Sequence, residues 1–335
     1  MTITSIGDLA QSLVLRSRAG EIKQAISQLT EELSTGRTAD VAQRLGGDYS
    51  YLSDIEHNLK VLDGYALAAS EAATFASETQ SSLERLHEST SSLSGALLLA
   101  GTEATDAARK HASAQAGSAL ETAVSTLNRS VAGRSLFSGT QTDHAPLATA
   151  QDLLGALKAT VTGLSTSSEI MTAVETWFSD PAGFASTMYF GGDFDLASIQ
   201  IGPGEQVSVS LRADNAAFQN LMKNVAVAAL ATDPELALSR SIQSELISGT
   251  GENLLGVGDV LIGMSADLGF AQARIEEAAI RSASARTGLE YARQDLLEAD
   301  PFDTATRLES LQFQLESLYS VTVRTSRLSL VNFLK

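Results

Sequence analysis

Proline is absent from both ends of this 335-residue chain. All five prolines lie between Pro146 and Pro301, so the first 145 residues and the last 34 contain none. A proline inside a helix costs about 3 kcal/mol, and stretches without one can form long uninterrupted helices. The last 34 residues also lack glycine. We therefore expect long helices at both ends and irregular structure only in the middle.

Apolar residues recur at intervals of three and four in both ends, which is typical of helices that pack in coiled-coil fashion. The seams comprise Ile22, Ile26, Leu29 and Leu33; Leu52, Ile55, Leu59, Leu62, Ala66, Ala69, Ala73 and Ala76; Ile275, Ala278, Ser282, Ala285, Leu289, Ala292 and Leu296; and Leu308, Leu311, Leu315 and Leu318. The predicted fold is mainly α, with a long antiparallel coiled-coil-like bundle formed by both chain ends. The alternative is that each seam is the buried stripe of an ordinary helical domain.

The middle of the chain has a different composition. Seven of the 18 aromatic residues lie between Trp177 and Phe218. Three features predict a β-hairpin. Apolar and polar residues alternate around Ile199, the turn sequence Gly-Pro-Gly follows at 202–204, and the alternation resumes from Val207 to Leu211. We expect a central α+β insert that contains β-hairpins, with strands around 185–212 and an aromatic core of its own.

The predicted organisation has three parts. Residues 1–45 and 302–335 are expected to be terminal helices, and their charges nearly balance. Residues 46–146 and 263–301 form a helical stalk, and residues 147–262 form an outward-facing insert. The terminal segments sum to +1, so the stalk and insert carry -18 of the total net charge of -17, and such an acidic body repels its neighbours.

Composition excludes several classes of function. The net negative charge argues against nucleic acid as a partner, because phosphate contacts need clustered cations. Cysteine is absent, so disulfides and thiolate chemistry are excluded. We find no apolar run near the 18–20 residues of a membrane span and no cleavable secretory signal. We therefore expect a soluble protein without membrane insertion.

The chain shows no pattern typical of an active site. The Gly256-Val257-Gly258 sequence lacks the third glycine of a dinucleotide motif, and none of the four histidines has a partner at metal-binding spacing. Asp193 and Asp195 could contribute to a calcium site or to a hydrolase, but turn chemistry is the favoured interpretation. We predict a protein that is not an enzyme, with no cofactor, no metal and no catalytic residue.

Three segments resemble the flagellin superfamily. The sequence from Ile26 to Arg37, which ends Ser-Thr-Gly36-Arg37, is similar to the end of the first flagellin helix. The C-terminal Ser-Arg327-Leu-Ser-Leu segment is similar to the closing flagellin helix. The loop from 133 to 143 carries Gly133, Phe137 and Gly139, and within the superfamily it is most similar to the hook-associated subunits that join hook to filament.

The resemblance implies a structural subunit of the bacterial flagellum that transmits torque between hook and filament. It is expected to be exported without a cleaved signal, with the help of an export chaperone, and to form homo-oligomers outside the cell beside flagellin and other hook-associated proteins. The implied subunit-interface residues are leucines of the terminal helices: Leu29, Leu33, Leu308, Leu311, Leu315, Leu318, Leu328 and Leu330. Each of them could instead serve packing within one chain. A flagellin of the filament itself and a cytoplasmic signalling coiled coil are the alternatives.

Overall fold

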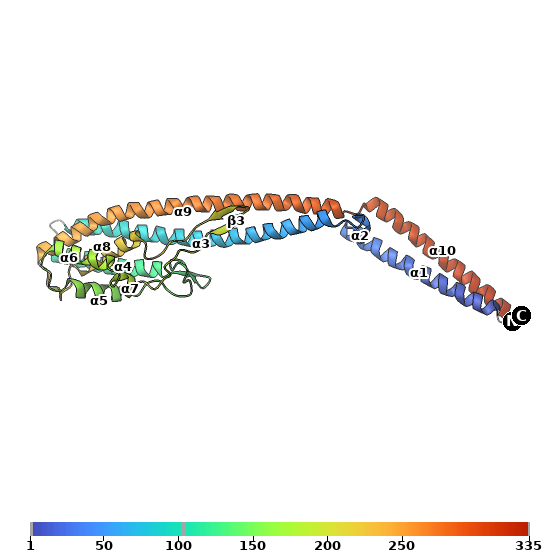
Figure 1. Ribbon diagram of the computed structural model, residues 1–335, viewed down its shortest axis with the longest axis horizontal. Coiled ribbons are helices and arrows are strands. Elements are labelled where there is room, and N and C mark those ends of the chain that lie inside the picture. Colours follow the sequence, from blue (N-terminus) through green and yellow to red (C-terminus); the bar gives the residue numbers. More distant parts are fainter. Residues whose placement is uncertain (1–2, 102–104, 334–335) are drawn as a thin grey trace. The chain divides into compact units, whose positions relative to one another are not determined.

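The computed structural model describes the backbone of residues 3–101 and 105–333, and the side chains of residues 10–101 and 105–324. The chain divides into two compact units (Figure 1). Unit 1 comprises residues 1–62 and 284–335, and unit 2 comprises residues 63–283. The predicted mainly helical fold, with paired chain ends and hairpins in the middle, is confirmed.

Unit 1 is built around two long helices, α1 (Ile3–Thr35) and α10 (Pro301–Phe333), which lie side by side (Figure 1). They run antiparallel, because Lys23 contacts Tyr319 while Gly36, just beyond α1, bonds Ala299 ahead of α10. Asp300 caps α10: its carboxylate accepts hydrogen bonds from the backbone N–H groups of Phe302 and Asp303. This is the role predicted for an aspartate before a proline at the first helical position.

A short connection follows α1. Gly36 adopts a left-handed φ of 68° and its N–H bonds the carbonyl of Glu32, which is the usual end of a helix. Helix α2 (Val41–Arg44) is capped by Asp40. Beyond it, Gly46 and Gly47 also have positive φ and return the chain toward α3.

The two longest helices are α3 (Ser50–Gly101) and α9 (Arg240–Leu297), and each has a segment in both units. In unit 2 they approach closely: the Ser94 hydroxyl donates to the carbonyl of Gly251 over 2.8 Å. A Cβ on Gly251 would lie 3.1 Å from the Cβ of Leu97, so glycine permits this close crossing without displacing the Leu97 side chain.

The predicted alanine seam of α3 is partly wrong after Leu62. Ala69 and Ala76 are buried as predicted, but Ala66 and Ala73 are exposed and Ala72 is buried. Around Tyr65, two successive intervals between inward-facing residues are both three residues long, whereas a heptad alternates three and four. Such an interruption shifts a heptad pattern. Ala285 of α9, also assigned to a seam, is likewise exposed.

Five further helices belong to unit 2. They are α4 (Asp106–Leu127), α5 (Ala150–Val161), α6 (Ser167–Ser179), α7 (Phe184–Thr187) and α8 (Ala216–Leu230). Helix α8 packs along α4 and also contacts α5 and α6. Residues 185–187 are predicted to lie in a strand, but they belong to α7.

Two small antiparallel hairpins complete unit 2. Strands β1 (Ser130–Val131) and β2 (Arg134–Ser135) form a hairpin that the sequence did not predict. Strands β3 (Ile199–Gly202) and β4 (Glu205–Val207) form the predicted hairpin, with Ile199 opposite Val207. The second strand ends at Val207, whereas the alternation predicted it as far as Leu211. Beyond it, the Ser210 hydroxyl accepts a hydrogen bond from the Leu196 N–H, and Arg212 donates to the Asp193 carbonyl.

The expectation that the insert has its own core is wrong. Buried residues of α3, α4, α8 and α9 form one cluster with those of α5 and α6. Phe137 contacts Phe218 edge to face, with ring centroids 5.6 Å apart, and Ser113 of α4 donates to the carbonyl of Ala228 in α8 over 2.8 Å. The aromatic residues of the insert therefore complete the core formed by the helices that precede and follow it in the sequence.

Capping boxes begin α5 and α6. Asp152 accepts a 2.6 Å hydrogen bond from the Thr149 hydroxyl, and Glu169 accepts hydrogen bonds from the backbone of Thr166 and Ser165. The threonine hydroxyls hold the pKa of both carboxyl groups below the ordinary value.

These caps predict a pH dependence of stability. Because the pKa values are lower in the folded state, the stabilisation is complete above the ordinary carboxyl pKa of about 4 and disappears as the pH falls through the lowered values. Urea unfolding between pH 6 and 2.5 should therefore show a smaller loss of stability on acidification in a Thr149→Val/Thr166→Val variant than in the wild type. Parallel curves would contradict the assignment.

One helix among the described residues is long and apolar enough to cross a membrane by length and composition, contrary to expectation. Helix α9 contains an 18-residue window with a mean hydropathy of 1.5, of which 28% is buried. The sequence contains no uninterrupted apolar run of that length, because charged residues interrupt this window. The window reflects the exposed apolar side chains that α9 carries.

Candidate subunit interface and motif loop

Most of the predicted interface leucines lie between the two helices of unit 1. Leu29 of α1 and Leu308, Leu311, Leu315 and Leu318 of α10 are half-buried. Their spacing places them on the contact face of the α1–α10 pair, so much of their surface is already used within one chain. The remaining predicted leucines differ: Leu33 is 44% exposed, and the side chains of Leu328 and Leu330 lie outside the described residues.

The outward surfaces of the same helices carry large apolar side chains that do not belong to the predicted seams. Phe302 is 83% exposed, and Phe313 and Leu13 are each 71% exposed. The other members of this outward apolar set are Val14, Val321 and Val323. Exposed apolar groups at this density mark surfaces for protein contact. The signal available in the sequence was that these apolar residues fall outside the three- and four-residue spacing of the seams.

Lys23 and Tyr319 link α1 to α10. The Lys23 ammonium lies 5.7 Å from the centre of the Tyr319 ring, within the range of a cation–π contact. A hydrogen bond to Tyr319 raises the pKa of Lys23. This contact helps to set the register of two helices whose leucine seams alone would permit a shift by one heptad.

The motif residues Gly36 and Arg37 connect two segments of unit 1. Arg37 lies in an antiparallel bridge with Glu298, and the Thr38 N–H donates to the Leu297 carbonyl over 2.8 Å. Glu32 accepts a 2.8 Å hydrogen bond from the Ala39 N–H. The segment therefore holds the end of α1 against the end of α9. The side chain of Arg327 lies outside the described residues.

The other motif residues shape the loop of residues 133–143, here called the motif loop. Gly133 follows Ala132 in the β1–β2 turn, and both have positive φ, as a tight hairpin turn requires. Phe137 is completely buried, and its carbonyl accepts a 2.8 Å hydrogen bond from Ala213. Gly139 has φ of 59°, and a Cβ there would collide with the Phe194 carbonyl. All three therefore have structural roles in unit 2.

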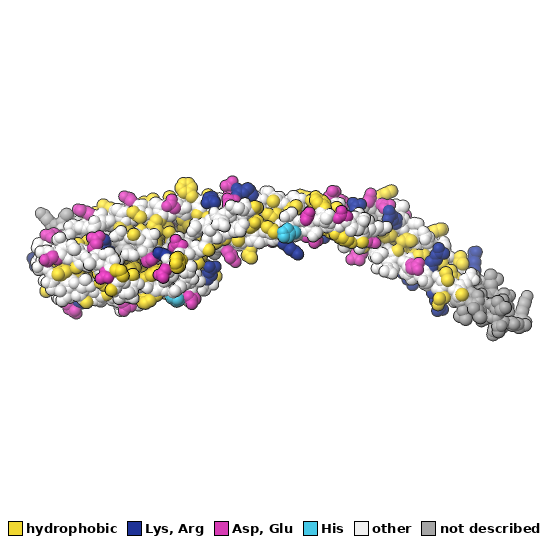
Figure 2. All heavy atoms as spheres, in the orientation of Figure 1, with side chains coloured by type: hydrophobic (Ala, Val, Ile, Leu, Met, Phe, Trp, Pro, Cys, Tyr) yellow, Lys and Arg dark blue, Asp and Glu magenta, His cyan; other side chains and the backbone are white. Residues whose placement is uncertain are grey.

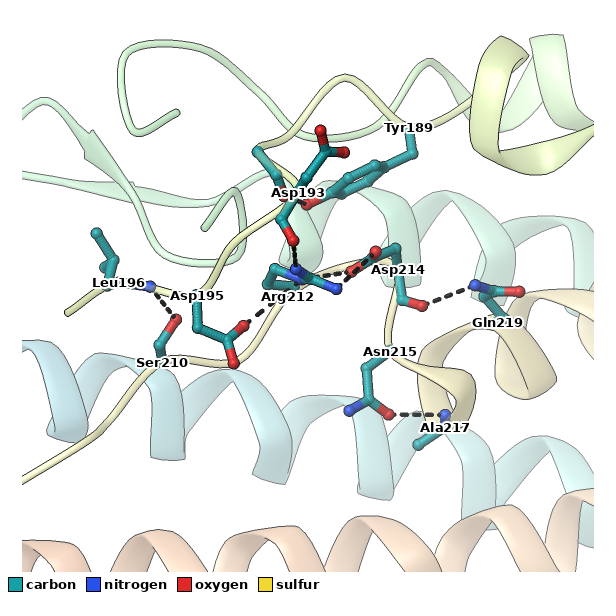
Figure 3. Close-up of polar contacts among 11 residues, drawn as sticks. Tyr189, Asp193, Asp195, Leu196, Ser210, Arg212, Asp214, Asn215, Ala217 and Gln219 are labelled. Atoms are coloured by element: carbon teal, nitrogen blue, oxygen red, sulfur yellow. Dashed lines mark hydrogen bonds and ion pairs between the residues drawn. The ribbon is translucent and has the colours of Figure 1, made fainter. Parts of the chain in front are cut away.

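Arg212 links the segment after α7 to the segment that precedes α8 (Figure 3). Its guanidinium binds Asp214 through two hydrogen bonds of 2.9 and 3.0 Å and also donates to the carbonyl of Asp193. Asp195 lies 3.5 Å from the same guanidinium. The Asp-x-Asp sequence thus surrounds a cation supplied by the chain, in agreement with the interpretation as turn chemistry.

Tyr189 completes this cluster. Its hydroxyl donates to the Gly192 carbonyl over 2.8 Å. Burial, reinforced by the negative charge of Asp214, raises the pKa of Tyr189 to about 12. The phenol therefore stays protonated and acts as a hydrogen-bond donor that supports the loop.

The histidines do not converge on one site. His57 and His111 are exposed on helices, and His144 contacts Asp143, Gln141 and the Phe190 carbonyl. His87 is half-buried in α3 and lies near Gly258 of α9. Among the residues that the structure describes, no group of three or more His, Asp or Glu side chains could hold a metal ion.

Long paired terminal helices that expose apolar side chains are typical of a structural subunit that assembles through them. Two family models agree with this class. The bacterial flagellin N-terminal helical region matches residues 6–142, and the bacterial flagellin C-terminal helical region matches residues 261–334. Together they cover more than half of the chain, which belongs to the flagellin superfamily.

Solved structures show the same fold. FlgL from Bacillus cereus has a TM-score of 0.53 at 13% identity, and the match covers 72% of this chain and all of that one. A provisionally named flagellar hook-associated protein from Vibrio parahaemolyticus has a TM-score of 0.51 at 14% identity, covering 75% of this chain and 99% of that one. No curated protein matches the sequence.

The chain is therefore an exported structural component of the flagellum that assembles with other flagellar components, and it is not an enzyme. The predictions of a flagellin-like, coiled-coil motility protein are confirmed at this level.

Proposed function

We propose that this protein is the subunit that joins the flagellar hook to the filament and transmits torque between them. The observation that carries the proposal is the outward apolar set on α1 and α10, which gives one helix pair contact surfaces for neighbouring subunits. The fold similarity to FlgL and to a second protein named as flagellar hook-associated supports the junction assignment.

In this proposal, subunits form a ring through the outward apolar set, and the half-buried seam leucines hold each helix pair together. Torque passes along interlocked helices, so the demand on the protein is mechanical stiffness. The connection at Gly36–Thr38 contributes by holding α1 and α9 together within unit 1.

A flagellin of the filament remains the second candidate, since both matched family models describe flagellin regions. The two roles differ in copy number, because a junction needs a few rings of subunits and a filament needs very many. They also differ in location along the flagellum.

A deletion strain of the source bacterium tests the assignment. The junction role predicts hooks without filaments, together with filament subunits released into the medium, and immunogold labelling of the complemented strain at the hook tip alone. Labelling along the whole filament, or a deletion strain that has no other filament protein to release, would establish the flagellin role instead.

Export without a cleaved signal is part of the same proposal. The secreted protein should retain the residues at its encoded N-terminus when it is sequenced. Loss of an N-terminal peptide during secretion would contradict this route. Pull-down from a strain with blocked export should identify a chaperone bound to the unassembled chain, and its absence would contradict that part of the proposal.

A further inference from the structure

Helix α9 carries a regular pattern on the side turned away from its buried residues. Acidic residues and glycines alternate there at intervals of three and four, which keeps them on one face. This acid–glycine stripe consists of Glu245, Gly249, Glu252, Gly256, Asp259 and Gly263. All except the half-buried Gly249 are exposed.

Nothing within the chain requires these glycines. A Cβ added to Gly249, Gly256 or Gly263 would meet no atom within 4 Å. Glycine inside a helix is unfavourable relative to alanine, so three of them on an open surface weaken α9 without benefit to packing in the described structure. Their consequence is an uncovered helix backbone that another helix can approach closely.

The stripe borders a groove between α9 and helices α6 and α8. A hollow of about 650 Å³ is lined by Met171, Lys223, Gly256 and Val260, among others. A second hollow of about 210 Å³ lies against Glu245, Gly249 and Glu252. Both hollows are lined by Met171 and Asn253, and the two adjoining hollows are here called the α9 groove.

Helix α9 exposes apolar as well as acidic side chains. On the face of unit 2 that Figure 2 shows, apolar side chains are interspersed with acidic ones. Val260, Leu255 and Ile262 of α9 are each more than half exposed, and Phe270 is 72% exposed. Of these, Val260 lines the groove, so exposed apolar surface suited to a partner reaches it.

Charge identifies the partner. Residues 241–273 of α9 contain four acidic residues and no lysine or arginine. The only cation that lines the α9 groove in the described structure is Lys223, which lies 3.4 Å from Glu175. A second copy would bring the same excess of acid, since unit 2 has 11 Lys+Arg against 25 Asp+Glu. A basic surface is the electrostatic complement.

We propose that the α9 groove is a docking site for a basic amphipathic helix of another protein. Leucine-sized side chains of that helix would lie over the glycines, and its lysines or arginines would pair with Glu245, Glu252 and Asp259. The stretch from Glu245 to Val260 is about 22 Å long, enough for four turns of helix. This inference does not depend on whether the subunit belongs to the junction or to the filament.

Fluorescence anisotropy with the full chain tests the proposal. The probe is a labelled 18-residue helical peptide with leucines at heptad positions and lysines beside them. We expect saturable binding that weakens with added salt. A peptide in which glutamate replaces every lysine, and a scrambled lysine peptide of equal charge, should each bind at least tenfold more weakly.

Two variants of the protein locate the site. Gly256→Leu fills the floor of the groove and should weaken binding at least tenfold, and Glu252→Lys/Asp259→Lys should weaken it at least fivefold. The matched control is Gly95→Leu, because Gly95 is an exposed helical glycine on α3 whose added Cβ also meets nothing. Its affinity should stay within twofold of the wild type. Circular dichroism verifies folding, and the charge variant carries the test if Gly256→Leu is misfolded.

Several results would overturn the proposal. These are absence of binding by the lysine peptide, equal binding of the glutamate or scrambled peptide, and unchanged affinity in both groove variants. Sedimentation that shows Gly256→Leu altering self-association would assign the groove to a second copy. Binding of the wild type to phosphatidylcholine vesicles, lost in Gly256→Leu, would assign it to a membrane surface.

Discussion

Replacing Phe313 by aspartate is expected to abolish subunit assembly and leave the monomer folded. Phe313 is 71% exposed on α10, so the monomer loses little packing. In an assembly it loses the burial of a large apolar side chain, about 1.5–3 kcal/mol, and adds the cost of an unpaired carboxylate. A loss of about 3 kcal/mol lowers an association constant by more than a hundredfold, and each subunit contact repeats it. Electron microscopy and sedimentation measure assembly, and circular dichroism measures the monomer.

Two comparison variants separate contacts between subunits from contacts within one chain. Phe313→Leu keeps an apolar group and should assemble. Leu315→Asp changes a half-buried seam residue only two positions away and should reduce the helicity and the hydrogen-exchange protection of α1 and α10 in the monomer. Normal assembly of Phe313→Asp, or loss of monomer helicity in it, would contradict the assignment of the outward apolar set.

Phe137→Ala is expected to destabilise unit 2 by about 3–5 kcal/mol, the usual cost of removing a buried phenylalanine ring. Phe137 is completely buried and packs edge to face on Phe218. It also sits where the motif loop meets α8, so its loss should loosen the segments held by Arg212. Trp177 is the only tryptophan of the chain and lies in α6, so its fluorescence reports urea unfolding of unit 2.

The control for this experiment is Phe194→Ala. Phe194 belongs to the segment that bonds the motif loop, but its side chain is 75% exposed. Its removal should change the free energy of unfolding by no more than about 0.5 kcal/mol. Equal destabilisation by the two substitutions would show that backbone contacts, and not the buried ring, hold the motif loop in place.

Local signals in the sequence determined much of this protein. Terminal stretches without proline and with leucines at three- and four-residue spacing predicted the long paired helices, since both features act through the helix itself. Apolar and polar residues that alternate on each side of Gly202 and Gly204 predicted the β3–β4 hairpin, since this pattern also acts locally along the strands. The superfamily resemblance also followed from short segments, and the family models agree with it.

The tertiary structure decided what local patterns leave open. Alanines at 66, 69, 72, 73 and 76 fit two seam registers equally well, and only the packing of α3 selected one. The insert shares a core with α3, α4 and α9 because its aromatic residues fill space that those helices leave open. Similarly, Leu315 and Phe313 are both apolar residues of one helix, but α1 covers one and leaves the other exposed. Periodicity records where apolar residues lie along a helix, whereas burial depends on which neighbouring element covers each face.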